Sequence, residues 1–382
     1  MIRVLIADDS AFMRMVLSDL FKKQPDFEVV DTAKNGKEAV EKVLKLKPDL
    51  LTLDVNMPVM DGLQALEVIM KDCPVPVVMC SSLTKEGADA TIKALSLGAI
   101  DFINKTGGSV SRIDTIETEI ISKCRAAAGA KIIRGGDVPR AVIKSPPAPA
   151  IHHIELPPHR TVHLPPLHNL PASSARFKLT PHLVPKEEPG EKQEKLVVLG
   201  TSTGGPKALQ TVIGGLPKNL PSGVLVVQHM PPGFTKSLAE RLDEISQISV
   251  KEAGNHDIIE KGHVYIAPGN YHMTVVNGAR GREILLNQDP PLGTLRPAAD
   301  VLFNSVAPLG KDIVSVILTG MGADGAAGMK AIKEHGGYVI AEAEETCVVY
   351  GMPKAVIDQG LADEVRRLPE IAGAIVNAVI NY

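Results

Sequence analysis

Short apolar runs alternate with longer amphipathic segments over the first third of the chain. The runs are continuously hydrophobic, as strands buried on both faces are, while the segments between them carry apolar residues three or four positions apart. Parallel strands need such crossover helices. The pattern predicts a doubly wound, flavodoxin-like α/β domain of five β-α units in residues 1–125. Its five predicted strands are RVLIA, FEVVDTA, DLLTLD, VPVVMC and AIDFI.

The same alternation returns over residues 195–382 and predicts a second doubly wound, mostly parallel α/β domain. MTVVNGARGREILLN interrupts it and predicts a small antiparallel hairpin with Asn277-Gly278 as its turn. The predicted strands are LVVLG, GVLVVQHM, HVYIAPG, DIVSVILTG and GYVIAEA. The predicted helices are SLAERLDEI, PAADVLFNSV and AAGMKAIKEH.

Between the two domains, residues 126–194 are rich in proline and histidine, as in KSPPAPAIHHIELPPHRTVHLPPLHNLP. Proline at this density is incompatible with helix or sheet, so we expect a disordered linker with polyproline character. The histidines have no regular spacing and no accompanying carboxylates or cysteines. We therefore interpret them as incidental rather than as a metal site, and leave open that the linker docks to a partner.

Composition narrows the class of protein. Apolar residues make up 44%, charged residues 22% and aromatic residues 3% of the 382 residues, and the net charge is −3. Neither a nucleic-acid surface nor membrane insertion is expected from this balance. The four cysteines form no C-x-x-C pair, which is typical of a reducing compartment. Acidic residues as early as position 8 argue against a signal peptide, so we expect a cytoplasmic protein.

Acidic residues follow two predicted strands of the first domain. Asp8 and Asp9 follow the first strand, and Asp54 ends the third. Carboxyl ends of parallel strands share one edge, where three carboxylates repel one another unless a cation such as Mg²⁺ neutralises them. Ser81 and Lys105 end two further strands. Single strand-end acids often only cap helices, but the five groups together indicate a phosphoryl-transfer site.

The motifs LIADDSAFMR, LTLDVNMPVMDG, VVMCSS and GAIDFINK resemble the receiver domain of two-component response regulators. The resemblance implies that Asp54 is the phosphoacceptor and that a histidine kinase is the phosphodonor. It implies Mg²⁺ bound by Asp9, Asp54 and the backbone carbonyl of Asn56, with Asp8 acting through water.

The same resemblance implies that Ser81 and Lys105 contact the phosphoryl group and that Phe102 is an aromatic switch. One position departs from the family: Thr106 stands where proline usually follows the lysine. The Lys-Pro bond is commonly cis in the family, so the geometry of this loop is open.

The turn in LVVLGTSTGGPKAL, residues 196–209, fits two kinds of site. A strand, a glycine turn and a helix can cradle a phosphate, whereas G-x-S-x-G presents a nucleophilic serine. Ser202 occupies the middle glycine position of a G-x-G-x-x-G fingerprint, and neither a ribose-binding acid nor a G-K-[ST] ending follows. These observations favour the nucleophile and leave a nucleotide-dependent oxidoreductase as the weaker alternative.

A nucleophilic serine needs a base, and the base needs an acid that orients it. His229 ends the next predicted strand and Asp324 lies in the glycine-rich turn after a later one. Each residue alone has a structural explanation as a cap or a packed side chain. Together with Ser202 they predict a triad at one sheet edge. The remaining histidines of this domain have no implied partner, although one lies beside a strand end; they are His256, His263, His335 and, at the strand end, His272.

The motifs GTSTGGPKAL, QHMPPGFT, GHVYIAPG, RPAADVLF and LTGMGADGAAGM resemble the protein-glutamate methylesterase domain of bacterial chemotaxis. The resemblance implies a substrate: a glutamate methyl ester on a methyl-accepting chemotaxis receptor. Methanol would leave, and receptor glutamines would be deamidated by the same attack. The Met321 N–H is the oxyanion donor that the family implies, and Thr203 is a second candidate. No cofactor is expected in this domain.

The order of the domains suggests regulation. If the receiver covers the Ser202 edge, phosphorylation of Asp54 would uncover it and activate the esterase. Arg296 and the QHMPPGFT loop are candidates for the substrate groove. A DNA-binding output is disfavoured, because neither a helix-turn-helix pattern nor a basic face is present. An esterase acting in a sensory system other than chemotaxis stays open.

Overall fold

The computed structural model describes residues 1–82, 84–105, 113–130 and 195–382. The chain divides into two units, of which the first joins Met1–Ile132 to Gln193–Tyr382 and the second is Ile133–Lys192. The predicted linker lies, from residue 131 to residue 194, outside the described residues, and so does Thr106.

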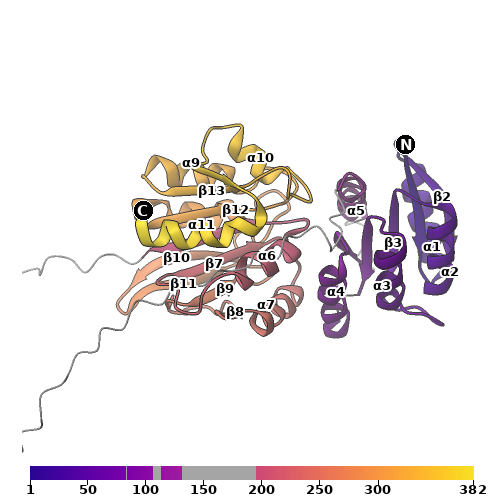
Figure 1. The fold of residues 1–382 in the computed structure, drawn as a ribbon, viewed down its shortest axis with the longest axis horizontal. Helices are drawn as coiled ribbons and strands as arrows, with labels where there is room; N and C mark the ends of the chain where they lie inside the picture. Colours follow the sequence, from indigo (N-terminus) through magenta and orange to yellow (C-terminus); the bar gives the residue numbers. More distant parts are fainter. Residues whose placement is uncertain (83, 106–112, 131–194) are drawn as a thin grey trace, which may run out of the picture. The chain divides into compact units, whose positions relative to one another are not determined.

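The N-terminal part is a parallel five-stranded sheet in the order β2-β1-β3-β4-β5 (Figure 1). Core residues of α2, α3 and α4 pack on one face, and those of α1 and α5 pack on the other. The five predicted strands and the doubly wound fold are confirmed. The elements are β1 (Ile2–Ala7), α1 (Ala11–Lys22), β2 (Phe27–Ala33), α2 (Gly36–Leu46), β3 (Leu50–Asp54), α3 (Gly62–Asp72), β4 (Val77–Ser81), α4 (Lys85–Leu97), β5 (Asp101–Asn104) and α5 (Ile113–Ala128).

The C-terminal part is a seven-stranded parallel sheet in the order β14-β13-β12-β6-β7-β9-β8, with the separate antiparallel pair β10-β11. Figure 1 shows helices along both faces of this sheet. The elements are β6 (Leu196–Thr201), α6 (Gly205–Gly214), β7 (Gly223–Gln228), α7 (Phe234–Ile245), β8 (Ser249–Glu252), β9 (His263–Ile266), β10 (His272–Gly278), β11 (Gly281–Asn287), α8 (Ala299–Val306), β12 (Ile313–Ile317), α9 (Ala326–Glu334), β13 (Tyr338–Glu342), α10 (Met352–Ile357), β14 (Glu364–Arg366) and α11 (Leu368–Asn381).

Strand β6 lies at the centre of this sheet and is buried along its whole length. Val197 and Leu199 pack with α6, α7 and α11, whereas Leu196 and Val198 pack with α8 and α9. Successive side chains of a strand point to opposite faces, so a continuously apolar strand needs helices on both sides. This is why the apolar run predicted a central parallel strand.

The hairpin departs from the prediction in its turn. Strand β10 continues through Asn277, which pairs with Arg282, and Gly278 pairs with Gly281. The turn residues are therefore Ala279 and Arg280, two positions later than predicted. Gly281, directly after the turn, has φ +124°, a conformation that favours glycine.

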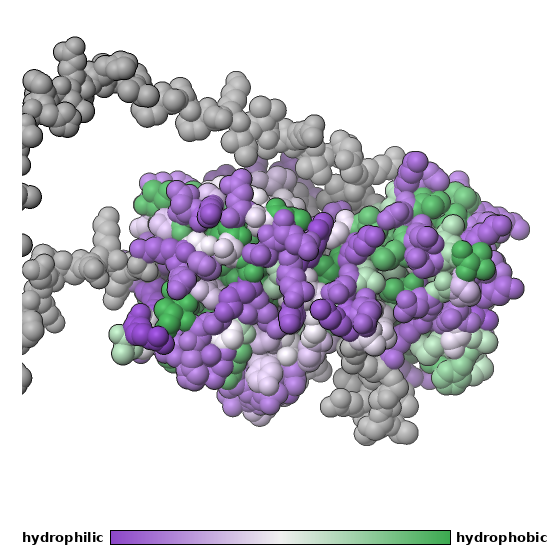
Figure 2. Space-filling model, turned by 90° about the horizontal axis from the view of Figure 1, so that it is seen from below, coloured by the Kyte–Doolittle hydropathy of each residue, from purple (hydrophilic) through white to green (hydrophobic). Residues whose placement is uncertain are grey.

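On the face drawn in Figure 2, hydrophilic residues are interspersed with small groups of hydrophobic ones. None of the helices in the described ranges combines the length and the apolar character that crossing a bilayer requires.

Candidate functional site

Ser202 lies at the point where the direction of winding in the seven-stranded sheet reverses. The chain runs outward from β6 to β7 on one side, whereas β12, which follows later, pairs with β6 on the other side. The crossovers after β6 and β12 leave on opposite faces, since α6 and α9 belong to different cores. A crevice forms at the carboxyl ends of strands at such a switch point, and open α/β sheets bind ligands there.

Thr319, just beyond β12, holds the turn that carries Ser202. Its carbonyl oxygen accepts from the Ser202 N–H at 3.1 Å and from the Thr201 hydroxyl at 2.8 Å. Its own hydroxyl donates to the Thr203 carbonyl at 3.0 Å. Thr201, Ser202 and Thr203 are thus all hydrogen-bonded to the buried residue Thr319. This role of Thr319 was not predicted from the sequence.

Two glycines make this turn possible. Gly204 has φ +79°, a left-handed conformation that favours glycine and lets the chain enter α6 directly after the serine. Gly320 passes so close to the serine that a Cβ there would lie 2.9 Å from the Ser202 Cβ. A side chain at Gly320 would therefore displace the candidate nucleophile.

His229 and Asp324 meet at the same edge. His229 Nε2 lies 2.7 Å from Asp324 Oδ2, and both side chains are nearly buried. This pairing leaves His229 Nδ1 as the ring nitrogen available to another group. Within the described residues, no hydrogen bond joins the Ser202 hydroxyl to His229. The catalytic roles of the three residues remain a prediction.

The first turn of α8 holds the carboxylate of Asp324. Oδ2 accepts from the Ala299 N–H at 2.6 Å, and Oδ1 accepts from the Asp300 N–H at 3.0 Å. Burial on its own raises the pKa of Asp324, but the hydrogen bond from His229 and these backbone donors hold the pKa below its ordinary value. The carboxylate is therefore ionised and can stabilise a protonated imidazole.

Asp300 completes a reciprocal arrangement between α8 and α9. Asp324 precedes α9 and accepts from α8, while Asp300 belongs to α8 and accepts from the Gly328 N–H of α9 at 2.7 Å. Burial, and then the negative charge of Asp324, raise the pKa of Asp300. The sequence pattern does not predict this role of Asp300, because its partner is a backbone group of another helix.

Replacing Asp300 separates these two roles of its carboxyl. Asp300→Ala leaves the Gly328 N–H without its acceptor, so we expect a loss of about 1–2 kcal/mol in the free energy of unfolding. Asp300→Asn keeps an acceptor oxygen and removes the repulsion from Asp324, so its stability should stay within about 0.5 kcal/mol of the wild type. Urea unfolding measures both. Equal losses in the two variants would contradict this role.

Of the predicted oxyanion donors, Thr203 directly follows the serine, and Met321 directly follows Gly320, which approaches the Ser202 Cβ. Neither the Thr203 N–H nor the Met321 N–H forms a hydrogen bond to another group in the described part of the chain. Unengaged backbone donors are what an oxyanion hole requires. Their role stays a prediction.

Other predicted residues lie farther along this edge or away from it. The Arg296 guanidinium binds the Asn270 carboxamide at 2.6 Å and the Asp289 carbonyl at 2.9 Å, so it ties two loops together. His272 is buried and its Nε2 lies 3.2 Å from the Pro290 carbonyl oxygen. The remaining three histidines bind nearby groups: His256 with Glu283, His263 with the Lys261 carbonyl and His335 with the Ala331 carbonyl.

The first sheet has its own switch point between β1 and β3, and the predicted acidic site lies there. Carboxylate oxygens of Asp8, Asp9 and Asp54 lie within 4.8 Å of one another. Lys105 Nζ lies 2.7 Å from Asp8 Oδ2 and 2.7 Å from Asp54 Oδ2. Burial raises the pKa of Asp54, Lys105 lowers it and Asp8 raises it again, with a net increase. Three converging carboxylates fit a hard divalent cation such as Mg²⁺.

The other predicted residues of this site are placed as follows. The Asn56 N–H donates to Asp54 Oδ1 at 3.4 Å, so the Asn56 backbone lies beside the carboxylate. The Ser81 hydroxyl donates to the Gly87 carbonyl at 3.0 Å, inside the core. Phe102 is buried, and its ring stacks on Phe234 of α7 with centroids 4.5 Å apart.

Strand β5 also reaches the turn of Ser202. The Thr203 hydroxyl donates to Asp101 Oδ2 at 2.5 Å. Phe102 follows Asp101, and Lys105 of the acidic site follows three residues later. A short segment thus joins the two sites. Two further side-chain hydrogen bonds support the contact, from Ser237 to Asp89 and from Gln210 to Ser96.

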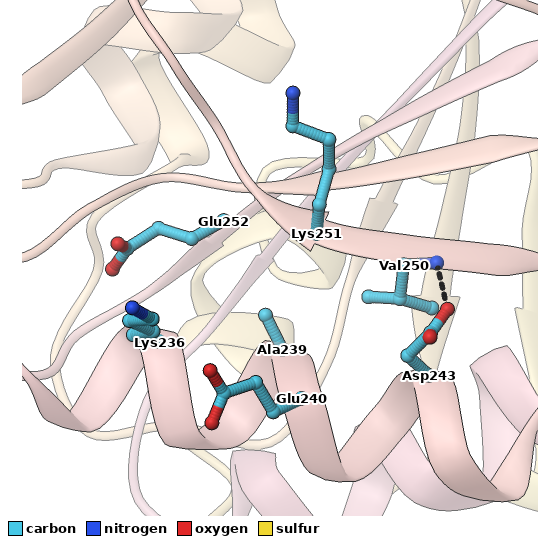
Figure 3. Close-up of a pocket in the computed structure, with 7 residues that line it drawn as sticks. All are labelled: Lys236, Ala239, Glu240, Asp243, Val250, Lys251 and Glu252. Atoms are coloured by element: carbon cyan, nitrogen blue, oxygen red, sulfur yellow. Dashed lines mark hydrogen bonds between the residues drawn. The ribbon is translucent and has the colours of Figure 1, made fainter.

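A pocket of about 330 Å³ lies between α7 and β8 (Figure 3). None of the residues predicted for either site lines it. Its lining carries both signs of charge, and Asp243 is engaged with the Val250 N–H at 2.7 Å. We assign no function to it.

Two parts of the chain match known protein families. Residues 197–375 match the CheB methylesterase family and residues 4–116 match the response regulator receiver domain. A protein-glutamate methylesterase/protein-glutamine glutaminase of Symbiobacterium thermophilum is 48% identical over 99% of this chain and 97% of that protein. The protein of the same name from Archaeoglobus fulgidus is 45% identical over 98% of this chain and 97% of its own length.

Among solved structures, the Thermotoga maritima CheB methylesterase catalytic domain is 46% identical and covers 48% of this chain and 98% of that chain, with a TM-score of 0.48. The full-length relatives match both parts of the chain in the same order. The chain therefore belongs to the family of CheB methylesterases that carry a response regulator receiver domain.

Proposed function

We propose that this protein hydrolyses glutamate methyl esters on methyl-accepting chemotaxis receptors and deamidates receptor glutamines, with Ser202 as nucleophile. The observation that carries the proposal is the buried His229–Asp324 pair at the switch point where the Ser202 turn lies. The names of the full-length relatives support the two activities.

In the proposed reaction, His229 Nδ1 takes the proton of the Ser202 hydroxyl as the oxygen attacks the ester carbonyl carbon. Asp324 fixes the imidazole through Nε2 and stabilises its positive charge. The N–H groups of Thr203 and Met321 are the proposed donors to the tetrahedral oxyanion, and one such donor is commonly worth about 3 kcal/mol.

The intermediate then collapses. The bond between the carbonyl carbon and the methoxy oxygen breaks, and the proton on His229 passes to the leaving methoxide. Methanol departs and leaves an ester between the Ser202 oxygen and the glutamate side chain. Water loses a proton to His229 and attacks this ester, and the proton returns to the serine oxygen. The product is a free glutamate carboxyl. A glutamine side chain would follow the same path with ammonia as the leaving group.

We further propose that Asp54 is phosphorylated by the kinase of the same signalling system. Mg²⁺ would be held by Asp9, Asp54 and the Asn56 carbonyl, with Asp8 acting through water, and would neutralise phosphoryl oxygens there. The Lys105 ammonium, already between Asp8 and Asp54, would contact the phosphoryl group. Contact by Ser81 needs its hydroxyl to leave the Gly87 carbonyl.

The contact of β5 with the Ser202 turn supports a restraint on the esterase. Phosphorylation adds about −1.5 to −2 charges at Asp54. Because Lys105, Phe102 and Asp101 lie on one segment, displacement of Lys105 toward a phosphoryl group would move the neighbours that hold Phe234 and Thr203. Release of Thr203 would then activate the esterase.

The direct experiment measures methanol released from membranes that contain methylated receptors. The full chain should release methanol, and glutamate should appear at the methylated positions. Absence of methanol both with and without a small-molecule phosphodonor and Mg²⁺ would reject the proposed function.

Regulation is tested in the same assay. The phosphodonor should raise the wild-type rate, and Asp54→Asn should remove that increase. Asp101→Asn weakens the restraint on Thr203, so its rate without phosphodonor should rise by roughly 5-fold or more, the lower end of ordinary coupling between sites. Asp72→Asn, an exposed acid at the end of α3, is the control. An unchanged basal rate in Asp101→Asn would contradict the restraint.

A further inference from the structure

A second buried carboxyl lies behind the esterase site, outside the proposed triad. Glu342 is the last residue of β13, next to β12 in the sheet, and its side chain is 0% exposed. Acidic side chains are almost never fully buried unless they are paired with a cation or metal. Its environment therefore needs a physical explanation.

One oxygen of this carboxyl has a donor and the other has none. Oε2 accepts from the Thr319 N–H at 2.9 Å. Oε1 is buried and has no hydrogen-bond partner among the described residues. A carboxylate in this position would leave charge on an oxygen without a donor, which is costly inside a protein. A neutral carboxyl, with its proton on Oε1, carries no charge there, which lowers that cost.

The groups that face Glu342 do not neutralise a charge. The Thr346 hydroxyl and the Cys347 thiol lie beside it, and burial raises the pKa of that thiol, so the thiol stays neutral. The cation opposite Glu342 in the β13–β14 register is Arg366, which is exposed and bound to Glu364 at 2.6 Å. Burial accordingly raises the pKa of Glu342 to about 7, against the smaller lowering effect of the Thr319 hydrogen bond and of the neighbouring Thr346 hydroxyl and Cys347 thiol.

Thr319 connects this carboxyl to the nucleophile. The residue that donates its N–H to Glu342 is the one whose carbonyl and hydroxyl bind Thr201, Ser202 and Thr203. The next residue, Gly320, lies against the Ser202 Cβ. A shift of Thr319 would therefore move the serine and the Thr203 N–H together.

We propose that protonated Glu342 is a positioning residue of the esterase site: it holds Thr319, and through Thr319 the Ser202 turn, and turnover falls when Glu342 loses its proton. This inference rests on the function proposed above. Charge on Glu342 would draw water or donors toward Oε1 and displace the end of β12. The result is a fall in esterase activity at high pH. His229 cannot cause this fall, because a general base is active in its deprotonated form and limits the rate only at low pH.

The test compares pH profiles of kcat for methanol release by the full-length wild type, Glu342→Gln and Glu345→Gln. Glutamine keeps an acceptor for the Thr319 N–H and cannot ionise, whereas Glu345 is an exposed neighbour and serves as the control. From pH 7 to pH 8.5, kcat of the wild type and of the control should fall by roughly tenfold relative to Glu342→Gln, because most Glu342 loses its proton over that range. KM should change little. An alkaline fall of the same size in Glu342→Gln would overturn the proposal.

Unfolding in urea gives a second measurement that does not need activity. The unfolded carboxyl titrates near 4.5 and the folded one near 7, so between these values the folded state holds a proton that the unfolded state has lost. The urea concentration at the unfolding midpoint of the wild type should therefore fall relative to that of Glu342→Gln as pH rises from about 4.5 to about 7. It should stay lower at higher pH. A difference independent of pH would overturn the proposal. If the wild type released no methanol at any pH, the proposed function would fail while this measurement still decided whether Glu342 carries the proton.

Discussion

Ser202→Ala should abolish methanol release from methylated receptors, with a loss of at least about 10³-fold in kcat. The expectation follows from the loss of the only oxygen that the proposed mechanism uses for attack; the loss of a triad member leaves only what the oxyanion donors and substrate binding supply. Receptor binding should persist, because the serine side chain is small and its backbone hydrogen bond to Thr319 remains. The rate of methanol release is measured in samples quenched at successive times, and receptor binding is measured by co-sedimentation with receptor membranes.

The matched control is Ser249→Ala. Ser249 is an exposed serine on the edge strand β8, and its loss should leave the rate unchanged. Retention of more than one tenth of the wild-type rate in Ser202→Ala would exclude Ser202 as the nucleophile. That result would favour the alternative interpretation, in which the turn binds a phosphate group.

Asp324→Asn is the second substitution with a large expected effect, about 10³ to 10⁴-fold in kcat. Both oxygens of Asp324 accept from N–H groups, since Oδ2 receives His229 and Ala299 while Oδ1 receives Asp300. An asparagine must turn its NH₂ group toward one of these donors, so at least one hydrogen bond becomes a repulsive contact. If the NH₂ faces His229, the imidazole adopts the wrong tautomer and cannot act as a base through Nδ1.

Two measurements separate catalysis from folding in this variant. The free energy of unfolding should fall by about 1–3 kcal/mol, because a buried donor loses its acceptor. The protein should nevertheless stay folded, which circular dichroism checks. Asp358→Asn, at an exposed acid after α10, is the control. A folded Asp324→Asn variant with wild-type kcat would mean that His229 is oriented by another group.

The hydrophobic pattern was sufficient to predict the central strands because each is buried on both faces. The edges were less predictable. Strands β8 and β14 have only 4 and 3 residues and carry charged side chains, so their pairing depends on the neighbouring strand rather than on their own sequence. The hairpin turn was misplaced since the pairing of β10 and β11 extends through Gly278, which local turn preferences do not reveal.

The site was predictable to the extent that strand order brings strand ends together. Ser202, His229 and Asp8 directly follow strands and Asp54 ends one, and a parallel sheet collects such residues at one edge. The family predicted from the motifs is confirmed by the full-length relatives. The domain limits and the individual catalytic roles remain predictions.

Other functional contacts could not be predicted in this way, because they join residues far apart in the chain. Asp101 and Thr203 are 102 positions apart, and the Asp300 carboxyl meets a backbone N–H of a different helix. Thr319 binds the Ser202 turn through its backbone carbonyl and its hydroxyl. A threonine within an apolar run gives no sign of such contacts in the sequence.

The hydrogen bond between Thr203 and Asp101 couples the esterase site to the receiver domain in both directions. The coupling free energy between two sites is the same in both directions. If phosphorylation of the receiver raises the affinity for the receptor by some factor, receptor binding must favour the phosphorylated receiver by the same factor. Under the proposed regulation, a receptor segment that displaces Asp101 from Thr203 favours the phosphorylated receiver. A heavily methylated receptor array would then act as an effector of the signal that demethylates it, and the output of the enzyme would depend on how much substrate remains.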